Sequence, residues 1–288
     1  MELAPYLRAR ARLVERALSA RMSPGKSRLR QAIRYSLLAG GKRIRPILTL
    51  GAGEVCGAPP RVVMPFACAL EMIHTYSLVH DDLPAMDDDD MRRGRPTNHR
   101  VYGEGLAILV GDALLTEAFA CIADARGVPA SRVVRALGEL AIAAGEAGMV
   151  GGQALDLAAS GGAAVPFARV RDIHRRKTGA LLRAAVRVGA VVAGAKPPVL
   201  RRLTTYGEHI GLAFQIADDI EDAAGTAGDG RKDRQLGKAT YPSAVGLDGA
   251  RRLARRERDA AVAAIAGLGR RAEALCALAE MIVARVGA

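Results

Sequence analysis

The sequence contains no tryptophan, and aromatic residues make up only 3% of its 288 positions. Proteins that bind single-stranded nucleic acids without sequence preference stack the bases on aromatic side chains, so the net charge of +12 is weak evidence for such a partner. The basic residues are also spread over many segments, and the densest run, RRLARRERD at 251–259, is more typical of a solvated helix face. We therefore expect no nucleic-acid partner.

Cysteine is scarce as well. The four cysteines, at positions 56, 68, 121 and 276, are far apart and none forms a CxxC pair. This spacing argues against a zinc site and against a disulfide framework, and it is typical of buried thiols in a reducing compartment. The first 22 residues lack the apolar centre of a signal peptide, and no apolar run approaches the ~18 residues of a membrane span. We expect a cytoplasmic protein with no membrane span.

No Pro-, Gly- or Ser-rich linker divides the chain, and alternating β-branched runs are few. Ala and Leu are abundant and hydrophobic residues make up 50% of the sequence, which predicts an all-α protein. Long apolar helices are expected at 106–125 and 131–149, with a turn between helices at 197–199. Two acidic motifs, one in each half of the chain, share a site only if both halves belong to one fold, so a single domain over 1–288 is expected.

The most distinctive stretch is LVHDDLPAMDDDDMRRGR at 78–95, which holds six aspartates. Two carboxylates about 4 Å apart repel by roughly 4 kcal/mol at an effective dielectric of ~20, so the cluster is either neutralised by cations or solvated. The preceding residues, 62–80, have the pattern of a buried helix, and Pro84 disfavours helix at Leu83. Asp81 is therefore expected at the end of that helix, with the irregular LPAM segment bringing Asp87 back to share an ion.

A second acidic stretch, FQIADDIED at 214–222, places Asp218 and Asp222 on one face of a predicted helix. Like charges at this spacing destabilise a helix unless an ion relieves their repulsion. Ligation by carboxylate oxygens favours a hard cation, Mg²⁺ above zinc, with water and substrate phosphates completing its coordination. We interpret the two stretches as opposed carboxylates around Mg²⁺. The alternative for such a charge run is a solvated acidic turn.

The ordered set of motifs resembles the trans-polyprenyl diphosphate synthases. HDDLPAMDDDDMRRGRPTNH is similar to their first aspartate-rich motif in its DDxxxxD form, and DDIED to their second, DDxxD. Further matches are GGKRIRP at 40–46, EMIHTYSLVHDD at 71–82, GDALLTEAF at 111–119, GGQALDL at 151–157, HRRKTGALL at 174–182 and QLGKATYP at 235–242. The resemblance implies a helical bundle of the isoprenoid synthase type around a deep central cavity, a homodimer, and Mg²⁺-dependent condensation of isopentenyl diphosphate with an allylic diphosphate.

The resemblance also implies roles for individual residues. These are Lys42, Arg45, His74 and Arg93 on isopentenyl diphosphate; Arg92 and Lys238 on the allylic and leaving diphosphate; Lys177 and Thr178 facing the reacting carbons and the leaving group; and Asp81, Asp82, Asp87, Asp218 and Asp222 on Mg²⁺. Lys42, Arg43 and Arg45 also suit a phosphate site on physical grounds, because they stand at the start of a predicted helix after Gly40–Gly41. Gln215 offers an amide dipole to positive charge. The loop GTAGDGRKDRQLGKATYP departs from the family's GKxxGxD-like segment, so a role for Lys232 is in doubt.

Product length is expected to depend on the depth of an apolar pocket below the first motif. Tyr76 and Ser77 precede Asp81 by five and four residues, little more than one helical turn. A bulky Tyr there resembles the floor of a short-chain enzyme, and the pattern most resembles bacterial farnesyl diphosphate synthases. We predict mainly a fifteen-carbon product, with geranylgeranyl diphosphate next. DDIED argues against a class I terpene cyclase, and two complete acidic motifs argue against an inactive regulatory homologue.

Overall fold

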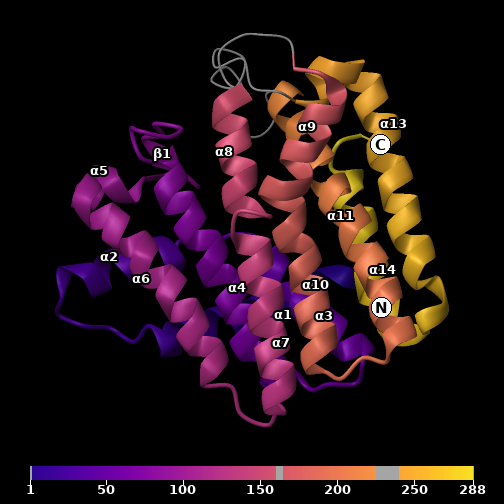
Figure 1. Ribbon diagram of the computed structural model, residues 1–288, viewed down its shortest axis with the longest axis horizontal. Coiled ribbons are helices and arrows are strands. Elements are labelled where there is room, and N and C mark those ends of the chain that lie inside the picture. Colours follow the sequence, from indigo (N-terminus) through magenta and orange to yellow (C-terminus); the bar gives the residue numbers. More distant parts are fainter. Residues whose placement is uncertain (1, 160–164, 225–239, 288) are drawn as a thin grey trace.

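The computed structural model describes residues 2–159, 165–224 and 240–287, which form a bundle of helices and one two-stranded hairpin (Figure 1). The helices are α1 (Leu3–Arg21), α2 (Arg28–Leu37), α3 (Ile44–Val55), α4 (Pro60–Asp81), α5 (Asn98–Tyr102), α6 (Glu104–Ala123), α7 (Ala130–Ala144), α8 (Met149–Ala159), α9 (Phe167–His174), α10 (Ala180–Val192), α11 (Pro197–Ala224), α13 (Tyr241–Ile265) and α14 (Glu273–Ala284). The hairpin pairs β1 (Met91–Arg92) with β2 (Arg95–Pro96). A π-helical turn, η1 (Arg175–Gly179), joins α9 to α10, and two 3₁₀ turns, η2 (Ala266–Leu268) and η3 (Arg270–Ala272), join α13 to α14. The all-α prediction is confirmed.

Two helices form the centre of the bundle. α4 packs against α3, α6 and α10, while α10 packs against α3, α7 and α11. The approach of α10 to α3 depends on Gly189, because a Cβ there would lie only 2.1 Å from the backbone oxygen of Thr49. The two backbones therefore lie almost in contact, and the carboxyl end of α4 is held by helices on several sides.

One charged side chain lies in the middle of α4. Glu71 is 2% exposed, and its Oε1 is 2.6 Å from Nη1 of Arg43, which is itself 3% exposed. Arg43 also donates from Nη2 to the Leu37 carbonyl at 2.9 Å. The sequence grouped Arg43 with its basic neighbours as part of a phosphate grip, but the structure turns it into the core. Its role is to neutralise Glu71.

Several predicted helix boundaries are correct and others are not. α4 ends at Asp81, as the sequence predicted. The helix expected at 131–149 is instead two helices, because Gly145 has an extended backbone that ends α7 at Ala144. The turn expected at 197–199 is the first turn of α11, where proline is tolerated because the first helical N–H groups need no intrahelical acceptor.

Two of the described helices are long and apolar enough to cross a membrane by length and composition. In α4, 67% of the apolar window is buried inside the protein, as in a core helix. In α6 the buried share is 39%. Two such helices are weak evidence for membrane insertion.

We expect Glu71→Gln to destabilise the fold by about 3–5 kcal/mol, because it leaves the Arg43 charge buried without its partner. The free energy of unfolding in urea measures this. Asp248→Asn is the control, since Asp248 forms an exposed ion pair with Arg251 at 3.2 Å and should change stability by less than about 0.5 kcal/mol. A loss below 1 kcal/mol for Glu71→Gln, on the order of a surface effect, would contradict the assigned role of Arg43.

Candidate active site

A cavity of about 380 Å³ opens between α4, α8 and η1. Its polar lining comes from four elements and consists of Arg45, His74, Ser77, His80, Asp81, Gln153, Lys177 and Thr178. Its apolar lining includes Tyr76, Met86, Met149, Val150, Ala154 and Leu157. The structure thus brings together seven of the residues singled out from the sequence, including both positions of the expected floor.

The first aspartate stretch folds back on itself after α4. The backbone N–H of Asp87 donates to the Asp81 carbonyl at 2.8 Å, and that of Asp89 donates to the Asp82 carbonyl at 3.1 Å. Asp88 has the left-handed backbone that such a reversal requires, with φ of 49°. The prediction that the LPAM segment returns Asp87 to Asp81 is therefore confirmed for the backbone.

The environment of Asp81 disfavours its charged form. Burial raises the pKa of Asp81 to about 6, the nearby Lys177 opposes that rise, and Asp87 adds to it. A cation that enters the site stabilises the charged form of a carboxylate with these neighbours. The site accordingly suits a positively charged ligand beside Asp81.

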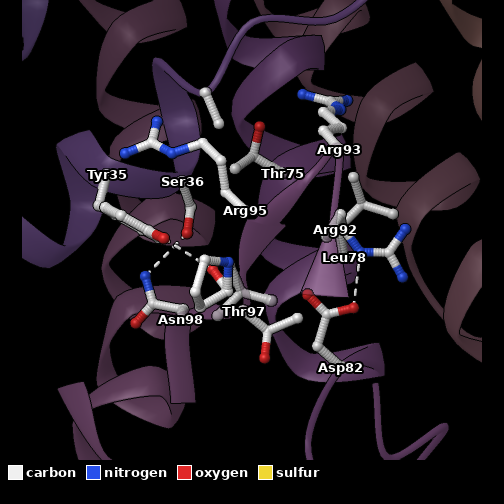
Figure 2. Close-up of a pocket in the computed structure, with 13 residues that line it drawn as sticks. Tyr35, Ser36, Thr75, Leu78, Asp82, Arg92, Arg93, Arg95, Thr97 and Asn98 are labelled. Atoms are coloured by element: carbon white, nitrogen blue, oxygen red, sulfur yellow. Dashed lines mark hydrogen bonds and ion pairs between the residues drawn. The ribbon is translucent and has the colours of Figure 1, made fainter. Parts of the chain in front are cut away.

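Asp82 lies apart from this cavity, because adjacent residues on a helix point about 100° from one another. It is 3% exposed and accepts from Nε of Arg92 at 2.6 Å, a contact drawn in Figure 2. Burial raises the pKa of Asp82 to about 6, and Arg92 opposes that shift. Arg92 also lies 3.4 Å from Asp89. In this state Asp82 is neutralised by a side chain of the hairpin.

The hairpin is anchored to α2 at its base. Tyr35 donates from its hydroxyl to the Pro96 carbonyl at 2.7 Å, and its ring lies 4.3 Å from the Arg95 guanidinium. Asn98 donates from Nδ2 to the Ala32 carbonyl at 2.9 Å and to Oγ of Ser36 at 2.7 Å. Figure 2 shows these side chains around a small cavity beside the hairpin. The anchoring fixes where the two hairpin arginines point.

Arg93 points away from Asp82 in Figure 2. It has a left-handed backbone (φ 53°) and donates to the Gly40 carbonyl. A Cβ on Gly41 would lie 2.7 Å from the Arg93 guanidinium carbon, so only glycine permits this approach. Arg93 is thereby held against the Gly40–Gly41 backbone, which precedes Lys42 in the chain.

Arg45 is the cation most clearly in need of a partner. Its Nε is buried and has no hydrogen-bond partner in the part of the chain that the structure describes. Burial lowers the pKa of Arg45 to about 10, and burial followed by the charge of Arg45 lowers the pKa of His74 well below its usual range. A buried guanidinium N–H without an acceptor costs free energy that an anionic ligand removes. His74 is therefore neutral beside an anion site.

The second aspartate stretch carries a cation that the sequence did not reveal. Arg285, just after α14, donates from Nη2 to Oδ1 of Asp218 at 2.5 Å and lies 3.1 Å from Glu221. Its guanidinium also lies 5.0 Å from the centre of the Phe214 ring. Burial raises the pKa of Asp218, and Arg285 opposes that rise. No motif surrounds Arg285, so only the fold shows its proximity to Asp218.

Asp219 is turned away from the cavity. Its Oδ1 accepts from Nε2 of Gln215 at 2.8 Å, and its Oδ2 accepts from the backbone N–H of Tyr241 at 2.8 Å. Gln215 in turn accepts from Oγ1 of Thr178 at 2.6 Å. The amide oxygen of Gln215 is therefore already engaged, and the atom presented beside the cavity is the hydroxyl oxygen of Thr178.

Lys177 and Thr178 both lie in the π-helical turn η1. Nζ of Lys177 is 2.6 Å from Oδ2 of Asp156 on α8, and a Cβ on Gly152 would lie 2.2 Å from the Lys177 backbone nitrogen. The GGQALDL stretch therefore forms one wall of the cavity. Its Gln153 has both amide atoms buried with no hydrogen-bond partner among the described residues.

The two aspartate stretches are the candidate ligands for a metal ion. Within the described ranges, no group of three or more Asp, Glu, His or Cys side chains is gathered closely enough to hold an ion alone. Mg²⁺ is nevertheless commonly held by one or two carboxylates, with water and substrate phosphates as its other ligands. Asp81 and Asp87 at one motif and Asp218 and Asp222 at the other supply such oxygens. Lys238 and Lys232 lie outside the described residues, so their roles stay predictions.

Comparison with known proteins identifies what the chain is similar to. The family model described as polyprenyl synthetase matches residues 26–273. A farnesyl diphosphate synthase of Geobacillus stearothermophilus is 47% identical over 85% of each chain. A geranylgeranyl diphosphate synthase of Cyanophora paradoxa is 46% identical over 98% of this chain and 96% of its own length. The crystal structure of an FPP/GFPP synthase from Zymomonas mobilis is 35% identical, covers 98% of both chains and has a TM-score of 0.89.

We expect Arg285→Ala to bind a divalent cation about tenfold more tightly, because a charge-assisted hydrogen bond worth roughly 1.5–3 kcal/mol no longer competes for Asp218. Titration of the protein with Mn²⁺, followed by electron paramagnetic resonance, measures this without turnover. Arg183→Ala is the matched control, since Arg183 pairs with Glu208 at 3.5 Å, away from the aspartates. Equal affinities in the two variants would show that Arg285 does not compete with the cation.

Proposed function

The chain belongs to the polyprenyl synthetase family and is a short-chain prenyltransferase of the farnesyl/geranylgeranyl diphosphate synthase type, and we propose that its main product is farnesyl diphosphate. Its substrates are isopentenyl diphosphate and an allylic diphosphate, either dimethylallyl or geranyl diphosphate. The observation that carries the proposal is Arg45, which lines the same cavity as Asp81 and whose buried Nε has no acceptor among the described residues. One cavity thus combines an anion site with carboxylates that suit a cation.

The allylic diphosphate binds at the aspartates. Asp81, Asp87 and Asp218, with help from Asp82 and Asp222, would hold Mg²⁺, which would neutralise the diphosphate and make it a better leaving group. Asp156 holds Lys177 beside the leaving diphosphate. Arg92, from the hairpin, and Lys238 are further cations for this diphosphate. Preorganised cations stabilise the charge that develops on the departing diphosphate, and this is usually the largest catalytic contribution.

The positive charge left on the allylic carbon faces Thr178. Because the Thr178 hydroxyl donates its hydrogen to Gln215, its oxygen lone pairs are available to that charge. Gln215 acts indirectly by fixing this orientation, and Asp219 fixes Gln215. Two partly buried hydrogen bonds therefore orient the dipole before substrate arrives.

Isopentenyl diphosphate binds to Lys42, Arg45, His74 and Arg93. His74 is neutral, because its pKa is held well below the usual value by burial and by Arg45, so it donates one hydrogen bond without adding charge. The double bond of isopentenyl diphosphate attacks the allylic cation, and the released diphosphate accepts the proton that is lost. No protein general base is needed.

Tyr76 supports a fifteen-carbon product. It is 7% exposed, lies beside the cavity and has its ring close to that of His80, as a floor below the reacting carbons requires. Geranylgeranyl diphosphate is the second candidate product, because one of the similar proteins is a geranylgeranyl diphosphate synthase.

We also propose a cytoplasmic homodimer, with all 288 residues in one domain. Apolar side chains are exposed along α6 and α7, and these are Ile108, Leu109, Val134 and Ile142. Burying such a face against a second copy removes it from water. Sedimentation of the purified protein tests the dimer.

Product analysis tests the proposal most directly. With Mg²⁺, isopentenyl diphosphate and either dimethylallyl or geranyl diphosphate, we expect farnesyl diphosphate as the dominant product, measured by chromatography after dephosphorylation. In Tyr76→Ala we expect longer products, because the pocket becomes deeper. A twenty-carbon wild-type product would keep the mechanism and move the floor elsewhere. No condensation at all would indicate an inactive regulatory homologue.

Arg45→Gln tests the anion site. We expect the KM for isopentenyl diphosphate to rise about 10- to 100-fold, the effect of losing a charge-assisted hydrogen bond, with a much smaller change in the KM for the allylic substrate. Steady-state kinetics with each substrate varied in turn measure this. Arg183→Gln is the surface control. A larger rise in the KM for the allylic substrate would show that Arg45 binds the allylic diphosphate instead.

A further inference from the structure

His80 precedes the first aspartate motif and has no part in the mechanism described above. Its Nε2 lies 3.0 Å from the backbone oxygen of Ile108, inside α6. A carbonyl only accepts hydrogen bonds, so Nε2 carries the hydrogen and donates it. His80 therefore joins the last turn of α4 to the backbone of the neighbouring helix, and its ring cannot rotate without losing that bond.

Gly111 makes this contact possible. A Cβ at position 111 would lie 1.9 Å from Nε2 of His80 and 2.4 Å from Cδ2. Any other residue at 111 would collide with the ring, so the glycine leaves a slot on α6 in which the imidazole lies. The ring is thus held by a hydrogen bond and by close packing at once.

His80 also contacts the proposed floor. Tyr76 lies four residues earlier, on the same face of α4. The two rings meet edge to face, with centroids 5.8 Å apart and planes at 73°, and both side chains line the cavity. His80 therefore stands between α6 and Tyr76 and limits how far the tyrosine ring can swing.

We propose that His80 is a specificity-determining residue that limits product length through Tyr76. The inference rests on the proposed function and deepens it. His80 is anchored to Ile108 and Gly111, and it braces the Tyr76 ring in the position that closes the tail pocket. Without the brace, Tyr76 remains in place but its ring moves aside often enough for a longer chain to pass.

The experiment measures the ratio of the next-longer product to the main product in wild type, His80→Ala, Tyr76→Ala and the double variant. Isopentenyl diphosphate is in excess and dimethylallyl diphosphate is the starter. The ratio is independent of total activity, so a variant that is merely less stable or slower lowers all products and leaves it unchanged. His209→Ala is the matched control, because His209 pairs with Glu257 away from this cavity.

We expect the ratio to rise about three- to tenfold in His80→Ala, the effect of losing one aromatic edge contact, and to rise further in Tyr76→Ala. The double variant should match Tyr76→Ala, because residues that act through one another are not additive. His80→Phe keeps the ring but loses the hydrogen bond, and its ratio should lie between those of wild type and His80→Ala. If His80→Ala does not fold, His80→Phe tests the inference in its place.

Two outcomes would overturn the inference. In one, His80→Ala and His80→Phe keep the wild-type ratio while Tyr76→Ala changes it. In the other, the double variant shows the sum of the single effects, so that His80 limits the tail by itself. Failure of the proposed function is distinguishable from both, because wild type would then form no condensation product, or Tyr76→Ala would leave its product length unchanged.

Discussion

Buried charge is the constraint on which this architecture depends. Four acidic side chains near the cavity each meet a cation from another element: Glu71 meets Arg43, Asp82 meets Arg92, Asp156 meets Lys177, and Asp218 meets Arg285. An unpaired charge in such surroundings costs several kcal/mol. The four cations come from the loop before α3, the hairpin, η1 and the end of α14. The charges are therefore neutralised only when the bundle has closed around them.

The same constraint explains how much of the site was predictable from the sequence. Asp81 at the end of a helix follows from an apolar pattern that stops before a proline, and these are local signals. The return of Asp87 to Asp81 follows from the irregular segment between them. The phosphate side, with Lys42 and Arg45 after two glycines, also follows from neighbours in the chain. The end of α4 and the return of Asp87 are encoded within a few residues, and for these two features the sequence was sufficient.

Where the chemistry depends on packing, it was not. Arg285 reaches Asp218 because α14 packs beside α11, and no pattern near either residue indicates this contact. Asp219 faces the start of α13 because of the rotation of α11, although it stands between residues of one acidic motif. Arg43 turns inward because Glu71 is buried opposite it. These orientations are set by which neighbours each helix acquires, and an isolated segment carries no information about its neighbours.

The π-helical turn at Arg175–Gly179 has a consequence for how this chain tolerates change. Such a turn holds one residue more than an α-helical turn and interrupts the regular hydrogen bonding, so α9 and α10 are out of phase with each other. Deleting a single residue here would restore a continuous α-helix and rotate one half by about 100° against the other. Lys177 and Thr178 would then leave the cavity even though every side chain of the site was still encoded. The chemistry of the site therefore constrains the number of residues in this segment as well as their identity.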